Sequence, residues 1–376
     1  MTNIKVKVGL YCFGKNHAID KYFQMLRVFN KMIEDGHFDP VILVDGTGSA
    51  EKDLRRYYDD KPIEFIDLRD NNINSLGLDY IVIIDPYNKP IIPFEEIKVP
   101  IIYKEYGVAG AELNAGYLIN KPVYKYASLI VTENPYMSEK IKDKYPGKHV
   151  LVGSPAFDYV FDNYYEDPRF KDGYIHLLWT PHHSIVENPG YDKITGGRYS
   201  TFLTYKDYFA NELLSTFDNV VLHIKPHPIL RGRYNHAYGK FNDYLNSFSD
   251  PSRVFIHEKE DFSSLFMKSD ILLNDSISFI QEWLPVNKPM IVLEDEDKAS
   301  YSSYGEDIVS NYYYRARSSE EITKLITILM TDDPKKRARS YMINSLYPQK
   351  GLTNTEFLLR YLLDWTKSKF INGYKL

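Results

Sequence analysis

The sequence predicts an α/β fold of two domains, each with a parallel β-sheet covered by helices on both faces. Near-continuous apolar runs alternate with segments of helical periodicity, and this alternation stops once and then restarts. The 376 residues are enough for two ordinary cores. No G-x-G-x-x-G follows the first strand and no G-x-x-x-x-G-K-[ST] occurs, which disfavours dinucleotide oxidoreductases and P-loop nucleotide hydrolases.

The first expected domain, residues 1–160, is a Rossmann-like layer. It opens with a strand at 4–12 and a helix at about 17–35, whose apolar residues form a broad stripe. Uniformly apolar strands separated by helices are typical of a parallel sheet that is buried on both faces. Further strands are expected at 41–44, 63–66, 80–84, 100–103, 128–131 and 149–152.

Residues 159–168 are polar and aromatic without a clear period, and we expect a linker there. The second expected domain, residues 171–350, is also Rossmann-like, and in tandem the two would face each other across a cleft. Residues 351–376 contain an amphipathic helix from about 353 to 370, which either packs back on the first domain, the preferred alternative, or rests on a lipid surface. The second domain has expected strands at 175–179, 220–224, 254–256, 271–273 and 290–293 and a helix at about 201–217.

Composition excludes several classes of protein. A formal charge of −5 argues against a general nucleic-acid binder, whose affinity rests on clustered lysine and arginine. The single cysteine, Cys12, excludes disulfides and cysteine-rich metal sites within the monomer. We expect a cytoplasmic protein that meets a membrane, if at all, peripherally at its inner face, because neither a secretory signal nor a spanning apolar run of about 18 residues is apparent.

Lys225 and His227 follow the strand at 220–224, where prolines end the apolar run. In open α/β sheets this carboxyl end of the strand faces the ligand. An ammonium group and an imidazole there would stabilise negative charge on a leaving diphosphate. The alternative is that His227 only caps the strand or binds a loop carbonyl.

Asp275, Ser276 and Ser278 follow the strand at 271–273, at an expected helix start. Unpaired N–H groups and the helix dipole attract anions to such a position, and the hydroxyl groups add donors. Glu282, one turn into the helix, could accept hydrogen bonds from ribose hydroxyls. Helix capping alone explains the same residues equally well. Together with Lys225 and His227 they predict a cradle for a diphosphate.

His182 and His183 end the strand at 175–179, and Glu105 follows the strand at 100–103. A neutral histidine could take a proton from an acceptor hydroxyl, but adjacent histidines point in different directions, so at most one serves as base. Glu105 is the other candidate, because apolar surroundings raise the proton affinity of a carboxylate. No third ligand with suitable spacing is apparent, so we expect neither a metal nor a cofactor.

Four segments of this chain resemble the CDP-glycerol glycerophosphotransferases of teichoic-acid synthesis, a family of GT-B type. The resemblance implies transfer of a polyol phosphate from a CDP-polyol to a hydroxyl of a cell-surface glycan or lipid-linked acceptor, with release of CMP. It also implies that His227 and the Ser276/Ser278 pair hold the CDP diphosphate. The segments are Lys225-Pro226-His227-Pro228, the runs 269–278 and 287–293, and 152–158, which is similar to the family's G-x-P-R-x-D.

Two departures from the family pattern leave the reaction partly open. Tyr106-Gly107 stands where the family has a histidine-glycine pair that supplies the acceptor base, and Ala156 stands where it has arginine. The base then falls to Glu105, His182 or His183, and the acceptor and the transferred group stay open. The alternatives are a glycosyltransferase that uses a CMP-sugar or another nucleotide-sugar, and a non-catalytic scaffold of a polymer-assembly complex.

Overall fold

The computed structural model shows two compact units. The first contains the described residues up to Glu105, from Ile119 to Tyr159 and from Leu346 onward, and the second runs from Val160 to Ser345. The chain passes from one unit to the other within helix α6 (Pro155–Asp162). The structure describes residues 5–13, 20–46, 51–84, 89–105, 119–162, 166–185, 198–258, 262–277, 279–296, 298 and 300–371.

The first unit is built on a seven-stranded parallel sheet with the order β3-β2-β1-β4-β5-β6-β7. Strands β2 and β3 lie on one side of β1, and β4 to β7 lie on the other side. The strand order therefore reverses between β1 and β4. The strands are β1 (Val6–Cys12), β2 (Phe38–Val44), β3 (Glu64–Asp67), β4 (Tyr80–Ile83), β5 (Ile101–Lys104), β6 (Leu129–Thr132) and β7 (His149–Leu151).

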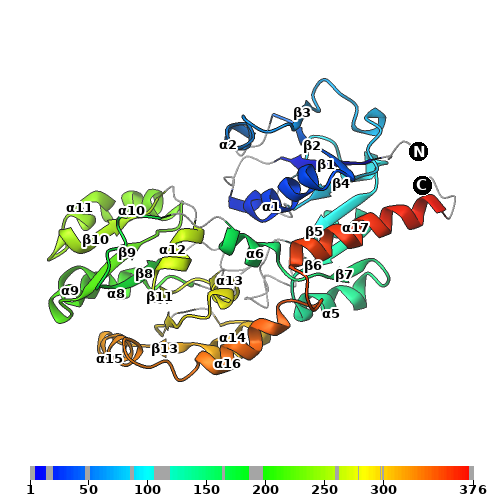
Figure 1. The fold of residues 1–376 in the computed structure, drawn as a ribbon. Helices are drawn as coiled ribbons and strands as arrows, with labels where there is room; N and C mark the ends of the chain where they lie inside the picture. Colours follow the sequence, from blue (N-terminus) through cyan, green and yellow to red (C-terminus); the bar gives the residue numbers. More distant parts are fainter. Residues whose placement is uncertain are drawn as a thin grey trace. The chain divides into compact units, whose positions relative to one another are not determined.

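Both faces of this sheet are buried. Val8 and Leu10 of β1 join one apolar core with residues of α1 and α17, while Tyr11 is fully buried although it points to the opposite face. Two-sided burial explains why the strands show continuous rather than alternating apolar residues. The other described elements of the unit are α1 (Asp20–Asp35), α2 (Glu51–Tyr57), η1 (Ile73–Ser75), η2 (Phe94–Glu96), α4 (Pro122–Tyr126), α5 (Pro135–Lys144) and α17 (Asn354–Ile371) (Figure 1).

The second unit has a six-stranded parallel sheet with the order β10-β9-β8-β11-β12-β13. Numbered from its first strand, this order is 3-2-1-4-5-6, the doubly wound arrangement in which ligands bind where the order reverses. Here the reversal falls between β8 and β11. The strands are β8 (Ile175–Thr180), β9 (Val220–Ile224), β10 (Val254–Ile256), β11 (Ile271–Asn274), β12 (Met290–Leu293) and β13 (Tyr314–Ala316).

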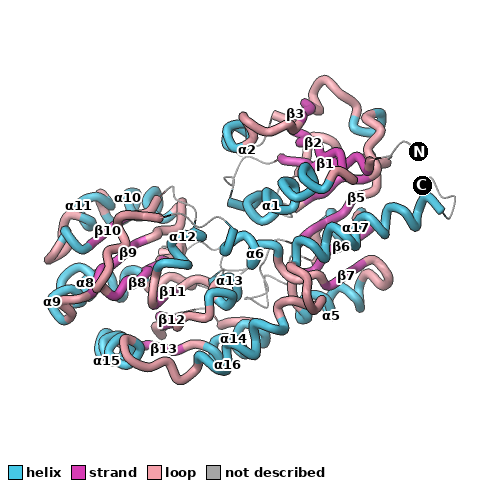
Figure 2. The backbone as a smooth tube through the Cα atoms, viewed as in Figure 1, coloured by secondary structure: helices cyan, strands magenta, loops and turns pink. Residues whose placement is uncertain are grey.

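Helices lie beside the strands of this sheet (Figure 2). Aromatic rings fill much of the core: Trp179 of β8 stacks on Phe202 and Phe209 of α8, with ring centroids 5.3 and 4.1 Å away. The described helices and turns are α8 (Phe202–Asn211), α9 (Leu213–Thr216), α10 (Leu230–Tyr238), α11 (Phe241–Leu245), η3 (Pro251–Arg253), α12 (Phe262–Lys268), α13 (Phe279–Glu282), η4 (Leu284–Val286), α14 (Ser303–Tyr312), α15 (Ser319–Leu329) and α16 (Lys336–Ser345).

Three local expectations differ from the structure, and one strand was not expected. Strand β2 begins at Phe38 and passes through Pro40, which is tolerated because β3 pairs with β2 only from Val41 onward. The helix expected at 201–217 is divided into α8 and α9. The linker expected at 159–168 begins inside α6, and the short edge strand β13 lacks the apolar run that would have predicted it.

Helix α17 is fastened at its N-terminus by Asp158. This carboxylate accepts hydrogen bonds from the backbone N–H groups of Asn354 (3.4 Å) and Thr355 (2.7 Å) and from the Thr355 hydroxyl (2.8 Å). Leu358 and Leu362 enter the core of the first unit, so the apolar side of this helix packs on protein. Within the described ranges, no helix combines the length and the apolar character that crossing a membrane requires.

Gly153 allows the chain to pass close to the start of α17. Its φ is +85°, and a Cβ built on it would lie 2.5 Å from Asn354 Oδ1 and 2.6 Å from the Leu346 carbonyl oxygen. We expect Gly153→Ala to lower the free energy of unfolding by more than the roughly 1–2 kcal/mol of the left-handed backbone alone. Urea denaturation measures this change.

Gly147→Ala is the matched control, because Gly147 also has a positive φ (+76°) but nothing lies within 4 Å of its added Cβ. If the two variants lost equal stability, the close approach at Gly153 would have no energetic importance.

Candidate functional site

The candidate site lies at the carboxyl edge of the second sheet, around its switch point. Strands β8 and β11 are neighbours there, with Thr180 opposite Asn274, and β9 flanks β8 on the other side. Parallel strands end at the same edge, so the residues that follow β8, β9 and β11 are brought together. The predicted positions 182, 183, 225, 227, 275 and 276 all lie just beyond these three strands.

Three of the predicted residues converge as a histidine cluster, His182, His183 and His227. One ring nitrogen from each lies within 4.8 Å of one from each of the others. The His227 ring centroid is 5.4 Å from that of His182 and 4.2 Å from that of His183. His182 and His183 are buried and His227 is partly exposed.

Backbone pairing continues past the strand ends and fixes the cluster. The Lys225 N–H donates to the Trp179 carbonyl (2.9 Å), and the His227 N–H donates to the Pro181 carbonyl (3.1 Å). The segment that carries His227 is therefore held against the segment that carries His182. The sequence shows no third metal ligand at a suitable spacing, whereas the folded chain brings three imidazoles within the spacing that a metal ion requires.

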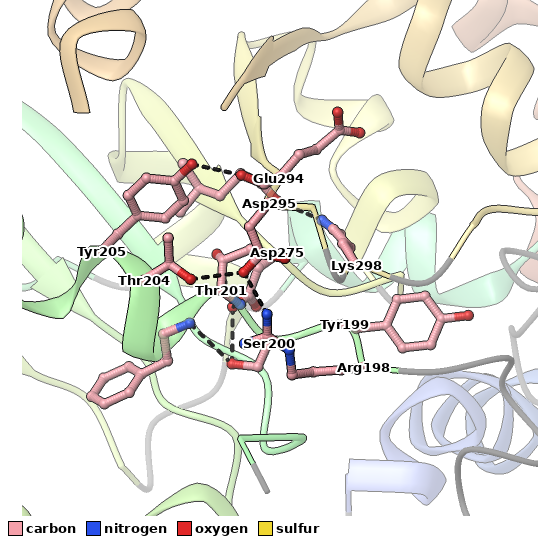
Figure 3. Close-up of polar contacts among 12 residues, drawn as sticks. Arg198, Tyr199, Ser200, Thr201, Thr204, Tyr205, Asp275, Glu294, Asp295 and Lys298 are labelled. Atoms are coloured by element: carbon pink, nitrogen blue, oxygen red, sulfur yellow. Dashed lines mark hydrogen bonds and ion pairs between the residues drawn. The ribbon is translucent and has the colours of Figure 1, made fainter. Parts of the chain in front are cut away.

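Asp275 ties the loops around this edge together. Its Oδ1 accepts from the His182 N–H (2.7 Å). Its Oδ2 accepts from the Thr201 N–H (2.8 Å), the Ser200 hydroxyl (3.2 Å) and the Thr201 hydroxyl (3.4 Å), and Figure 3 shows Asp275 beside Ser200 and Thr201. Burial raises the pKa of this carboxyl, while Lys298 and the hydrogen bonds oppose the rise. Both oxygens face protein donors, so direct contact of Asp275 with a diphosphate stays a prediction.

Ser276 is buried, and its backbone is shaped by the side chain of Asn274. The Ser276 N–H donates to Asn274 Oδ1 (3.2 Å), and Asn274 Nδ2 donates to the Ser276 carbonyl (2.6 Å). Ser278 lies outside the described residues. The expected helix is α13, whose four residues end at Glu282, so it lacks the length for the strong helix dipole that the sequence analysis invoked.

A group of charged residues beyond β12 was missed by the sequence analysis. Lys298 donates to the Leu293 carbonyl (2.6 Å), and Arg198 forms an ion pair with Asp295 (2.7 Å) (Figure 3). Burial lowers the pKa of Lys298 to about 8, although Asp275, Glu294 and Asp295 favour its charged form. The signal was present as a run of charges directly after a buried strand, Glu294-Asp295-Glu296-Asp297-Lys298.

Glu105 lies in the first unit, beyond β5, among other buried polar groups. Lys104 forms an ion pair with Glu133, which also accepts from the Ser154 hydroxyl (3.0 Å). Glu105 Oε1 accepts from the Tyr124 hydroxyl (3.1 Å), and Oε2 has no hydrogen-bond partner among the described residues. Burial, reinforced by Glu133, raises the pKa of Glu105 to about 8, so this carboxyl is largely protonated at neutral pH.

Replacing Asp275 with asparagine should destabilise the second unit by about 1–3 kcal/mol, because an NH₂ group would face an N–H or O–H donor in a buried place. Thermal or urea unfolding measures the loss. Asp243→Asn is the control, since Asp243 is exposed on α11 and its replacement removes a charge outside any buried network. Equal stability of the two variants would contradict the anchoring role of Asp275.

Replacing Glu105 with glutamine should change how stability depends on pH. The folded pKa of about 8 lies above the ordinary 4.5, so the folded state retains a proton that the unfolded state releases. The wild-type stability should therefore fall, relative to Glu105→Gln, as pH rises from about 4.5 to about 8. Urea titrations across that window test this, with Glu139→Gln, at an exposed position of α5, as the control. A constant difference between wild type and Glu105→Gln would show that Glu105 ionises normally.

Several solved structures share the fold at low sequence identity. The wall teichoic acid polymerase TagF matches with a TM-score of 0.57 and 13% identity, covering 99% of this chain and 91% of its own. UDP-GlcNAc 2-epimerase from Methanocaldococcus jannaschii matches with a TM-score of 0.62 and 12% identity, covering 96% and 100%. MurG from Acinetobacter baumannii gives 0.50 and 12%, covering 96% and 99%. These likenesses show a GT-B-like fold.

Sequence comparison connects the chain to a family. No curated protein matches it. The family model described as CDP-glycerol:poly(glycerophosphate) glycerophosphotransferase matches residues 107–350, a range that contains the histidine cluster and the donors around Asp275. This match spans well over half of the chain, and the protein therefore belongs to the CDP-glycerol:poly(glycerophosphate) glycerophosphotransferase family of enzymes.

Proposed function

We propose that this enzyme transfers glycerol phosphate, or a similar polyol phosphate, from a CDP-polyol to a hydroxyl of a glycan or lipid-linked acceptor. Membership of the family supports the donor class. The observation that carries the proposal is the histidine cluster at the switch point of the second sheet, the edge at which such sheets bind ligands. A lipid-linked acceptor would bring the enzyme to the inner face of the cell membrane as a peripheral protein.

The proposed reaction is a direct displacement at phosphorus. The acceptor oxygen attacks the β-phosphorus of the donor, and a new P–O bond forms as the bond to the oxygen that bridges to CMP breaks. The acceptor proton passes to a general base, and CMP leaves with the bonding electron pair. No covalent enzyme intermediate is needed, because positioning and charge neutralisation supply most of the catalysis in phosphoryl transfer.

Lys225, His227 and Ser276 are the proposed donors to the diphosphate. They follow two strands of one sheet edge, and Lys225 and His227 are partly exposed. Negative charge develops on the departing CMP, and donors that are already in place stabilise it without reorganisation. Ser278 and Glu282 are proposed to complete the donor site, Glu282 through the ribose hydroxyls.

Glu105, His182 and His183 are proposed as candidates for the general base. Glu105 can accept a proton only in its ionised form, which becomes abundant as the pH approaches its pKa of about 8. A turnover rate that climbs through this range in the wild type and not in Glu105→Gln would support Glu105. The Tyr106-Gly107 pair lies outside the described residues.

Replacing His227 with glutamine should reduce CMP release from CDP-glycerol by roughly 10²- to 10³-fold, the usual cost of losing a donor that stabilises developing charge. The assay supplies a poly(glycerophosphate) acceptor, and circular dichroism verifies the fold. His236→Gln is the control, because His236 is exposed on α10. Full activity of His227→Gln would remove His227 from the mechanism.

A panel of donors separates the proposal from its alternatives. Consumption of CDP-glycerol or CDP-ribitol with release of CMP supports polyol-phosphate transfer. Consumption of a CMP-sugar or UDP-sugar instead identifies a glycosyltransferase. Tight binding of a donor without turnover over all acceptors tested identifies a scaffold.

A further inference from the structure

The Ser184 hydroxyl has a hydrogen-bond partner for each of its two acceptor lone pairs and for its proton. Ser184 Oγ accepts from the backbone N–H groups of Tyr199 and Ser200, each at 3.1 Å. A hydroxyl oxygen has two acceptor lone pairs and one proton. Both lone pairs are occupied, so the proton points to the remaining polar neighbour, His182 Nδ1, at 2.8 Å.

His182 Nδ1 is therefore a hydrogen-bond acceptor. The Ser184 backbone N–H also points to it, at 3.3 Å, so two donors face one ring nitrogen. Burial lowers the pKa of His182 well below its usual range, and the neighbouring His183, His227, Arg233 and Lys298 lower it further. The ring is neutral at physiological pH, and its single proton resides on Nε2.

His227 has the same arrangement. The Ile229 backbone N–H donates to His227 Nδ1 at 3.2 Å, which also leaves the ring proton on Nε2. Both imidazoles thus carry an N–H group on the nitrogen that is turned away from its backbone partner. One ring nitrogen of His182 lies within 4.8 Å of one ring nitrogen of His227. Two N–H groups at such a spacing can both donate to a single oxygen at normal hydrogen-bond length.

The Nε2-protonated tautomer of His182 disfavours binding of a metal ion at the histidine cluster, although three imidazoles are close together there. Coordination through His182 Nε2 would move the ring proton to Nδ1, where it would face the Ser184 hydroxyl proton and the Ser184 N–H. The surroundings are also electropositive, because Arg233 and Lys298 act on His182. Preorganised N–H donors in a positive field suit an anion instead.

We propose that His182 and His227 form a paired N–H donor site for one oxyanion of the donor diphosphate, and that Ser184 positions this site by fixing the tautomer of His182. This inference rests on the proposed function only for the identity of the bound ligand. It replaces the expectation that His182 is a general base, since its Nε2 carries a proton and offers no lone pair. Glu105 and His183 then remain as the candidates for the general base.

The first test reads the tautomer in the intact protein without any substrate. In a sample with ¹⁵N-labelled histidine, His182, assigned by its absence in His182→Phe, should show an unprotonated Nδ1 and a protonated Nε2 between about pH 6 and pH 8. In Ser184→Ala the opposite tautomer should become populated. An unprotonated Nε2 in the wild type would overturn the proposal, and His182→Phe serves only to assign the signal.

The second test uses calorimetry with inorganic pyrophosphate and, separately, with Zn²⁺. Pyrophosphate should bind the wild type, and Ser184→Ala should weaken it roughly two- to tenfold, in line with impairment of one hydrogen bond. Ser215→Ala, on short helix α9 and exposed, should leave binding unchanged. Ser184→Ala should instead gain Zn²⁺ binding.

Two calorimetric results would overturn the proposal. One is Zn²⁺ binding by the wild type that His182→Phe abolishes, and the other is an equal pyrophosphate affinity in the wild type and His182→Phe. Neither measurement depends on turnover. An enzyme that binds pyrophosphate as expected but never consumes a CDP-polyol would refute the proposed function and leave this inference standing.

Discussion

The buried carboxylate of Asp275 is the interaction on which the candidate site depends. It follows β11, and it holds the backbone of His182 beyond β8 and of Thr201 before α8. Burying a carboxylate costs free energy unless several donors surround it, and four donors surround this one. The segments that carry the site are therefore fixed to one another before any ligand arrives.

The parallel sheets explain why polar chemistry gathers at one edge. Every strand of a parallel sheet delivers the residues that follow it to the same edge of the sheet. In the second unit these residues are histidines, a lysine and serines. In the first unit the same edge carries Lys104, the last residue of β5, with Glu105 and Glu133 directly beyond β5 and β6.

Local pairing then decides the protonation state of each group. Lys104 is paired with Glu133, and its favourable effect on the ionised form of Glu105 is smaller than the effects of burial and of the Glu133 charge, which favour the protonated form. Positive neighbours and burial act on His182 in the same direction and keep it neutral. A neutral imidazole still donates one hydrogen bond, and Ser184 determines which nitrogen donates it. Chemical function at this edge thus depends on contacts as much as on residue type.

The sequence by itself determined the α/β class, the positions of most strands in both units and the expectation that Lys225, His227 and Ser276 share one edge. It could do so because two-sided burial demands continuous apolar runs, and because prolines and polar residues mark where those runs end. It also suggested the raised proton affinity of Glu105, since apolar runs flank that residue.

Only the tertiary structure brought His182, His183 and His227 together. It also placed Ser184, Ser200 and Lys298 near them. These contacts join residues that are distant in the chain, such as Asp275 and Thr201, and no local pattern encodes a pairing between segments. The short length of α13 and the division between α8 and α9 were likewise decided by packing. Tautomers and protonation states depend on neighbouring donors and charges, which exist only once the chain has folded.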